Sequence, residues 1–184
     1  DAGGNPSADL DQYANDPPEE WVNGNLGASK ATYYEGDSVP YRLRFDNLAL
    51  SSHTVTIEWD TTKSDKHAED YLTTYSRTVA SANPCVGVTG CGAPTTFPIP
   101  LDPQVSGAGV TQIAGNFTIF GGTITSASAY TYASGSGFVG DKSARITLTF
   151  TASQVNPVLA WGGHIAHRQD WGASNSAISI PGSP

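Results

Sequence analysis

The segment from residue 58 to residue 70 carries the richest group of charged and oxygen-bearing side chains in the chain. In Asp60–Asp65, oxygen donors alternate along a short loop, and Asp70 follows nearby. Ca²⁺ takes about six to eight oxygen ligands, which such a loop and a more distant carboxylate could provide. The loop has neither the spacing nor the glycine of an EF-hand, so a solvated loop between two strands is the alternative. We predict no required cofactor, and calcium as a candidate ligand of Asp60, Asp65 and Asp70.

A second polar group lies near the end of the chain, in His164–Asp170. Two imidazoles and a carboxylate, from His164, His167 and Asp170, are a possible zinc or copper set. The odd spacing of the two histidines would place them on opposite faces of a strand, whereas a turn could bring them together. The alternative is a buried histidine that bonds to Asp170 or to a backbone carbonyl.

Aromatic side chains suggest a test for carbohydrate binding. Tyr130 and Tyr132 would share one face of a strand, and Trp171 lies in a Gly-containing segment near the end of the chain. Exposed on one face, the three rings would form a platform for stacking a sugar. The alternative is that they are core or rim residues, because aromatic side chains dominate burial.

Hydrolase motifs are weak. The chain has no Gly-x-Ser-x-Gly, and Gly135–Gly137 reads as a hairpin tip rather than a nucleophile elbow. Paired carboxylates for glycoside hydrolysis could come from Glu35, Glu58 or Asp60, but nothing in the sequence singles them out. We therefore expect a protein that is not an enzyme.

Cys85 and Cys91, the two cysteines, lie six residues apart in a Gly-rich segment. Such a pair predicts a local disulfide and hence an oxidising compartment. The chain contains no Met and starts at Asp1, which is typical of a processed, secreted form. We expect an extracellular protein at the cell surface.

The elements that must position these residues are strands. Val, Ile, Thr, Tyr, Phe and Trp together number 57, against 23 for Leu, Glu, Lys, Gln and Met, an imbalance that favours strands over helices. Period-two alternation is clear in Val39–Phe45, His53–Trp59 and Ser143–Ala152, and Val158–Ala166 is nearly all apolar, as in a central buried strand. Residues 66–72 are ambiguous between a helical turn and a strand, and Ala177–Ile180 reads as a last strand. The sequence predicts an all-β antiparallel sandwich of about eight or nine strands, with a closed barrel as the alternative.

Two segments stand apart in composition. Residues 1–20 hold six acidic residues, no basic residue and three prolines, which predicts an extended arm preceding a single sandwich domain at 21–184. Residues 81–112 form a long Pro/Gly-rich loop with one charge, Asp102, and long loops of this kind are often functional. The arm residues that we expect to contact another subunit are Asp9, Leu10, Tyr13, Pro17 and Pro18, and the alternative is a frayed terminus.

The charge balance excludes some partners. With 9 basic and 17 acidic residues the net charge is −8, so the basic face that nucleic-acid binding needs is missing. No apolar run approaches the roughly 20 residues of a membrane span. We expect no nucleic acid as a partner and no membrane span.

Several strings resemble bacterial secreted and cell-surface β-sandwich domains of the prealbumin-like, or SdrD-B-like, kind, and together they cover about half the chain: Trp21–Leu26, Val39–Arg42, Ile57–Lys63, His67, Asp70–Thr73, Leu159–Gly172 and Ser176–Ile180. The resemblance implies extracellular modules that space, join or assemble. Some such sandwiches carry a Lys–Asn or Lys–Asp isopeptide bond, and no counterpart of that motif is present here.

These observations favour a structural subunit of a surface fibre, sheath or layer that assembles with copies of itself through strand or arm exchange. The alternative is an adhesin-like or carbohydrate-binding module of a larger surface protein, with glycans as its partners.

Overall fold

Alternating apolar and polar residues form the two longest strands, which pair with each other. The computed structural model describes residues 4–27 and 29–180, so residues 1–3 of the predicted arm and 181–184 of the predicted domain lie outside it. Strand β4 (Ser52–Lys63) runs antiparallel to β11 (Lys142–Ala152). The inward positions of β11 are almost fully buried: Ala144, Ile146, Leu148 and Phe150.

These two strands are the centre of a five-stranded sheet, which we call the narrow sheet. Its order is β10-β11-β4-β5, and β9 also pairs with β11. The short strands are β5 (Lys66–His67), β9 (Gly122–Ala127) and β10 (Thr131–Ala133). Because β5 pairs only with Thr62 and Lys63, most of β4 forms the edge of the narrow sheet.

The other layer, the wide sheet, has seven strands in the order β2-β1-β3-β12-β8-β7, with β6 also pairing with β12. At its centre lies β12 (Val158–Ile165), which is buried along its whole length and confirms the expected central strand. The other strands are β1 (Ser7–Ala14), β2 (Glu20–Asn23), β3 (Ser38–Asp46), β6 (Glu69–Thr73), β7 (Pro94–Pro98) and β8 (Asn116–Phe120).

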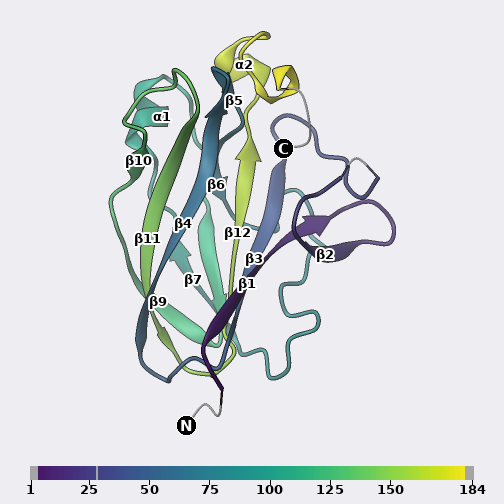
Figure 1. Ribbon diagram of the computed structural model, residues 1–184, viewed down its shortest axis with the longest axis vertical. Helices are drawn as coiled ribbons and strands as arrows, with labels where there is room; N and C mark the ends of the chain where they lie inside the picture. The colour runs from purple at the N-terminus through teal and green to yellow at the C-terminus, as the bar shows by residue number, and fades with distance from the viewer. Residues whose placement is uncertain (1–3, 28, 181–184) are drawn as a thin grey trace.

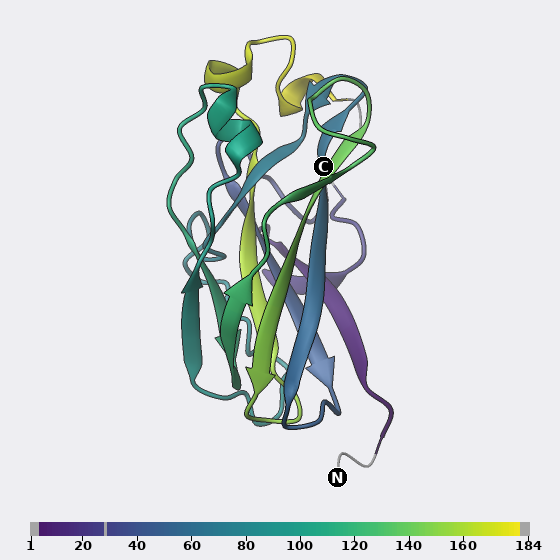
Figure 2. The ribbon, with the colours of Figure 1, turned by 90° about the vertical axis from the view of Figure 1, so that its left-hand side faces the viewer.

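The two sheets pack face to face around one main apolar core (Figures 1 and 2). The predicted antiparallel β-sandwich is thereby confirmed. The structure has about twelve strands, more than expected, because short strands interrupt segments that we read as single strands or as loops. Residues 66–72 form β5 and part of β6, and the predicted last strand is wrong, since a 3₁₀ helix covers Ala177–Ser179.

The predicted boundary at residue 20 is wrong for the described residues, because β1 belongs to the wide sheet. It pairs with β3 along Ser7–Gln12 and with β2 along Asp11–Ala14. Leu10 is 46% exposed, whereas Tyr13 is buried and donates a hydrogen bond to Glu19 at 3.0 Å. The predicted arm residues Pro17 and Pro18 lie in the connection between β1 and β2.

An ion pair on the outer face of the wide sheet holds β1 in place. Asp11 is 2% exposed and accepts a hydrogen bond from Nε of Arg42 at 2.7 Å, and Nε of Arg44 lies 3.0 Å from the same carboxylate oxygen. We call these three residues the Asp11 clamp. Alternation along β3 places Arg42 on the outer face of the sheet, yet it is only 5% exposed, because residues that include Pro84 and Val86 cover it and their carbonyls accept hydrogen bonds from its guanidinium.

The predicted long loop 81–112 is partly ordered into elements. It contains β7 and the short helix α1 (Pro103–Gly107), whose first turn is capped by Asp102 through the N–H of Gln104 at 2.8 Å. The predicted disulfide between Cys85 and Cys91 is present. The second helix, α2, covers Arg168–Trp171. In the described part of the chain, no helix has the length and apolar character to span a membrane.

The Asp11 clamp predicts the effect of a substitution on stability. Asp11→Asn leaves the buried guanidinium of Arg42 without its counter-charge, so we expect the free energy of unfolding to fall by about 3 kcal/mol, measured by urea denaturation. Asp9→Asn is the matched control: Asp9 is on the same strand, is exposed and lies 3.7 Å from Arg44, so its loss should cost less than about 1 kcal/mol. Equal effects of the two substitutions would contradict the role of the clamp.

Candidate functional site

The three candidate calcium ligands do not converge. The carboxylate of Asp65 accepts from the N–H of Gly140 at 2.6 Å, while Asp60 lies on β4. Asp70 is fully buried and accepts from Nδ1 of His164 at 2.6 Å and from Nε1 of Trp171 at 2.8 Å. Within residues 4–27 and 29–180, no three His, Cys, Asp or Glu side chains are grouped as metal ligands. The calcium prediction therefore has no support from the geometry.

The histidine set is divided as well. His164 bonds to Asp70 and stacks on Tyr71 at a ring separation of 4.2 Å, so its carboxylate partner is not the one expected, Asp170. His167 instead begins α2, where its Nδ1 accepts from the N–H of Gln169. The pairing of His164 with Asp70 joins β12 to β6, and it fits a structural hydrogen bond in the core.

The three candidate sugar-stacking rings each have an internal partner. The hydroxyl of Tyr130 donates to the carbonyl of Pro100 at 2.6 Å, and that of Tyr132 donates to Asp102 at 2.5 Å. Burial raises the pKa of both tyrosines. Trp171 stacks on His67 at 3.5 Å. These rings pack against the protein rather than forming one open platform.

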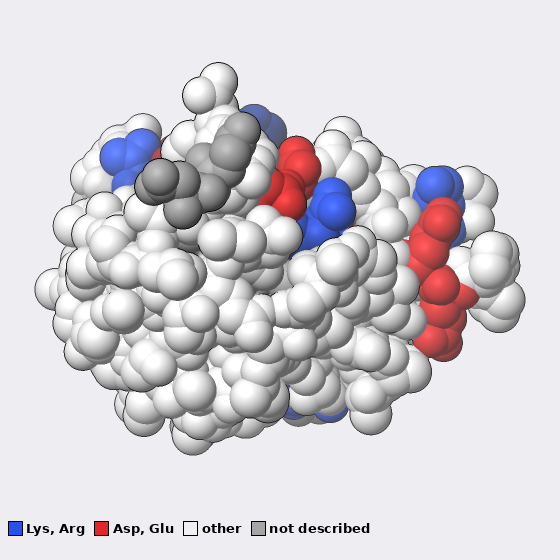
Figure 3. All heavy atoms as spheres, turned by 90° about the horizontal axis from the view of Figure 1, so that it is seen from below, with Lys and Arg blue, Asp and Glu red and all other residues white. Residues whose placement is uncertain are grey.

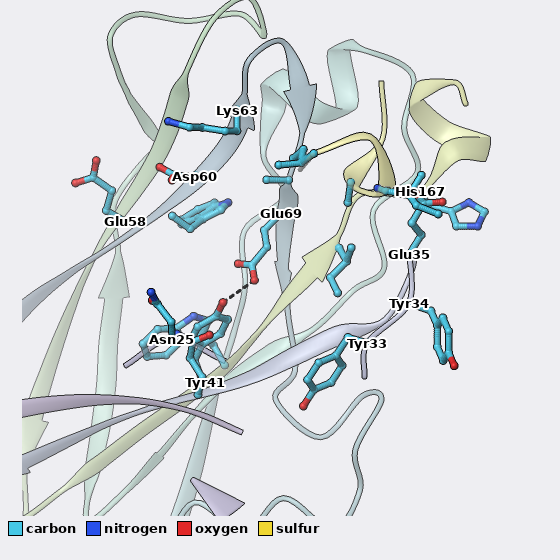
Figure 4. Close-up of a pocket in the computed structure, with 18 of the residues that line it drawn as sticks. Asn25, Tyr33, Tyr34, Glu35, Tyr41, Glu58, Asp60, Lys63, Glu69 and His167 are labelled. Carbon is cyan, nitrogen blue, oxygen red and sulfur yellow. Dashed lines mark hydrogen bonds between the residues drawn. The ribbon is translucent and has the colours of Figure 1, made fainter. Parts of the chain in front are cut away.

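Sequence reasoning missed a groove of about 950 Å³. It lies beside the edge of β4, over the inner face of the wide sheet, and Figure 4 shows side chains of both sheets pointing into it. Its floor and walls are mainly apolar and aromatic, with carboxylates at the rim. Residues from five of the strands line it, including Leu10, Tyr41, Ile57, Trp59, Glu69, Trp161 and Ile165.

The groove exists because the two sheets differ in width. The narrow sheet stops at β4, whereas the wide sheet continues through β3 and β1 to β2, as Figure 1 shows. The inner face of the extra strands has no opposing strand. Tyr41 on β3 stacks on Trp161 of β12 at 5.8 Å there, and Leu10 of β1 adds a further apolar side chain. An apolar face of this kind is what a sandwich normally covers with another strand.

The edge of β4 presents unpaired main-chain groups to the groove. On the far side of β11, the carbonyl of Thr147 accepts a hydrogen bond from the N–H of Ser128 at 2.8 Å. The N–H of Thr147 donates to the hydroxyl of Ser128 at 2.9 Å. The main chain of Thr147 therefore points away from β4. Its cross-strand partner is Thr56, whose N–H and C=O must point away from β11, toward the free edge. No described strand pairs with that edge at Thr56.

Glu69 is the buried carboxyl of the groove. It is 8% exposed, and its Oε1 accepts from the hydroxyl of Tyr41 at 2.6 Å, the dashed line in Figure 4. The pKa of Glu69 is raised to about 7, mainly by burial. The hydrogen bond from Tyr41 lowers it, and the charges of Asp70 and Asp60 contribute to the rise. None of the ion pairs among the described residues includes Glu69. This carboxyl therefore has no counter-charge.

Gly163 makes room for that carboxyl. A Cβ atom at Gly163 would lie 2.2 Å from Oε2 of Glu69, so only glycine allows the side chain to cross β12 at this point. The sequence contained this signal, because Gly162 and Gly163 interrupt an otherwise apolar strand, and a glycine inside a strand indicates a close approach of another group.

The segment after α2 closes one end of the groove. Glu35 accepts from Nε of Arg168 at 2.7 Å and from the N–H of Ile178 at 3.1 Å. These contacts hold Ala177 and Ile178 against the groove.

Comparisons of the chain with protein-family models, with curated proteins and with solved structures found no match.

The raised pKa of Glu69 predicts how stability depends on pH. The folded protein binds the proton more tightly than the unfolded chain, whose Glu69 titrates near 4.5. The contribution of Glu69 to stability is therefore greatest below pH 4.5 and falls as the pH rises through 7, by up to about 3 kcal/mol. We expect Glu69→Gln to remove this fall.

The measurement is the free energy of unfolding by urea at several pH values, taken as the difference between wild type and variant. The difference is needed because burial lowers the pKa of His67 to about 4. In both proteins His67 therefore makes the free energy of unfolding rise with pH, which is opposite to the effect of Glu69. Glu58→Gln is the control, because hydrogen bonds from Arg145 and Ser143 lower the pKa of Glu58. Free energies of unfolding that change in parallel for wild type and Glu69→Gln between pH 4.5 and pH 7 would contradict this role of Glu69.

Proposed function

We propose that the protein is an extracellular structural subunit that assembles with copies of itself into a fibre, sheath or layer. In this proposal an extended strand from one copy adds to the free edge of β4 in the next copy. The observation that carries the proposal is the groove, which combines an unpaired strand edge with an apolar floor that has no described strand opposite it.

An extended strand matches both parts of the groove. Its main chain would bond to the outward N–H and C=O groups of β4, as in other cases of strand addition to a sheet edge. Its alternate side chains would cover the floor, which Tyr41, Trp59 and Trp161 help to line. The added strand would complete the narrow sheet opposite the extra strands of the wide sheet.

The donor that we propose is the N-terminal strand. In β1, Ala8, Leu10 and Gln12 alternate with Asp9 and Asp11, so one face is free of charge and suits the floor of a groove. Residues 4–10 are exposed, although the second half of β1 is held by β2 and the Asp11 clamp. Exchange would move β1 out of its own sheet and into a neighbour, the usual route of strand swapping. The groove that receives the strand would then keep Tyr41, Trp59 and Trp161 but lose Leu10 of its own β1.

The end of the sandwich near the N-terminus suits contact with another copy. Figure 3 shows this face from below, and few charged side chains are visible on it. The loops after β3 and β11 meet there, since the N–H of Leu48 donates to the carbonyl of Val155 at 2.9 Å. Leu50 and Val155 are exposed in these loops. Burying this face in an end-to-end contact would remove few charges from water.

The disulfide supports the location in this proposal. Cys85 and Cys91 are bonded to each other, and structural disulfides persist in oxidising surroundings such as the cell exterior. The disulfide loop contains Val86, whose carbonyl accepts from Arg42. It therefore also supports the clamp that positions β1.

An engineered disulfide between β1 and β3, which can be reduced again, tests whether β1 is the strand that is exchanged. Ser7 and Asp46 lie directly opposite each other in β1 and β3, at a separation that suits a disulfide, and neither belongs to the clamp. We expect the double variant Ser7→Cys/Asp46→Cys to stay monomeric when oxidised, because β1 cannot leave its own sheet, and to form polymers after mild reduction. Electron microscopy and sedimentation measure assembly.

Wild type taken through the same oxidation and reduction is the control, because its native disulfide experiences the same treatment. Ser7→Cys alone controls for the introduced thiol. Polymers of the oxidised double variant, formed as readily as those of wild type, would show that β1 is not the donor. Wild-type monomers under all conditions would overturn the structural-subunit proposal itself.

A further inference from the structure

We propose that Glu69, in its acid form, recognises the inserted strand by donating a hydrogen bond from Oε2 to a main-chain carbonyl, so that strand insertion takes up a proton wherever this carboxyl is ionised in the open groove. This inference rests on the proposed function and adds the chemistry of its contact. It makes Glu69 the polar recognition group of an otherwise apolar groove.

The geometry leaves one oxygen of Glu69 available. Oε1 already accepts from Tyr41, and none of the hydrogen bonds among the described residues uses Oε2. The carboxyl lies over Gly163 on the inner face of β12, and Figure 4 shows it between β4 and β3 within the groove. A strand placed along β4 would pass this oxygen.

The groups around Glu69 offer it no positive charge. The negative ones that act on it are Asp70 on its own strand and Asp60 on β4. The nearby cations are already paired: Lys63 lies 2.5 Å from Asp141, and Arg168 lies 2.7 Å from Glu35. The other titratable groups that line the groove are Tyr33, Tyr34, Tyr41, Glu58 and His167.

The proposed donor brings no positive charge either. Residues 1–20 contain six acidic residues and no Lys, Arg or His. Insertion of this segment would remove water from Glu69 without supplying a counter-charge, which penalises the ionised form strongly. The acid form avoids that penalty and has an O–H to donate. A strand that lacks basic side chains is therefore the partner that this site fits.

The direction of the pH effect follows from linkage. In the open groove, burial raises the pKa of Glu69 to about 7, and insertion raises it further. Assembly is therefore strongest below pH 7, where Glu69 is protonated before and after insertion. Above pH 7 each contact must take up one proton, so assembly weakens with rising pH.

The test is the critical concentration for assembly, measured by sedimentation from about pH 5 to about pH 9. For wild type we expect a constant value below pH 7 and a rise approaching tenfold per pH unit above it, the slope for one proton per contact. For Glu69→Gln we expect no such rise, with a value near that of wild type at low pH. An amide remains uncharged and still offers an N–H donor.

Two further variants sharpen the result. Glu58→Gln also removes a groove carboxylate, but because Arg145 and Ser143 lower the pKa of Glu58, this variant should keep the wild-type slope. Tyr41→Phe removes the hydrogen bond that lowers the pKa of Glu69. It should therefore move the start of the rise to higher pH while leaving the slope unchanged. Circular dichroism confirms that each variant is folded.

The outcomes separate this inference from the proposed function. If Glu69→Gln polymerises with the same slope as wild type, Glu69 is not the proton-linked group, and strand insertion itself is unaffected. If the oxidised Ser7→Cys/Asp46→Cys variant polymerises freely, the donor is wrong, whatever Glu69 does. A wild-type critical concentration that is independent of pH would overturn the inference directly.

Discussion

The unequal width of the two sheets is the constraint on which the rest of this structure depends. A strand at the edge of a sheet carries unpaired N–H and C=O groups, and an apolar face loses stability if water covers it. Here both conditions occur at one place, because the narrow sheet ends at β4 while the wide sheet continues through β3 and β1. The aromatic side chains of the groove and the buried carboxyl of Glu69 lie in the space that this difference in width leaves. The free edge of β4 therefore leaves main-chain N–H and C=O groups without a partner among the described strands.

In the proposed assembly, the Asp11 clamp opposes the release of β1 from its own sheet. Within one chain, Asp11 and Arg42 form a buried ion pair that keeps β1 beside β3. Leaving this position removes the counter-charge of Arg42, which is costly in a buried site. Strand exchange can therefore proceed only where the groove of a neighbour gives β1 comparable contacts. The half of β1 before Asp11 is exposed and pairs only with β3, so it is the part that can detach first.

Local alternation predicted the architecture well, and long-range contacts explain where it failed. The pattern of β3, β4 and β11 follows from side chains that point alternately inward and outward, and that of β12 from a continuous apolar run; both are properties of neighbouring residues. The burial of Arg42 could not be read from β3 alone, because the carbonyls that cover it come from Pro84 and Val86. Composition set residues 1–20 apart, yet the pairing of β1 with β3 depends on a strand about thirty residues further on. The groove depends on the order of strands in two sheets, which no local pattern contains. Only Gly163 carried a local signal of the site, as the residue that makes room for Glu69.

The most direct measurement is hydrogen exchange of the individual amides of β4 in the monomer and in the assembled protein. The N–H of Thr56 points to the free edge, and by the period of two so do those of Thr54 and Glu58, while Val55 and Ile57 face β11. The account predicts that Thr54, Thr56 and Glu58 exchange rapidly in the monomer and become protected on assembly, whereas Val55 and Ile57 are protected in both. Rapid exchange of Thr56 in fully assembled material would contradict strand addition at β4.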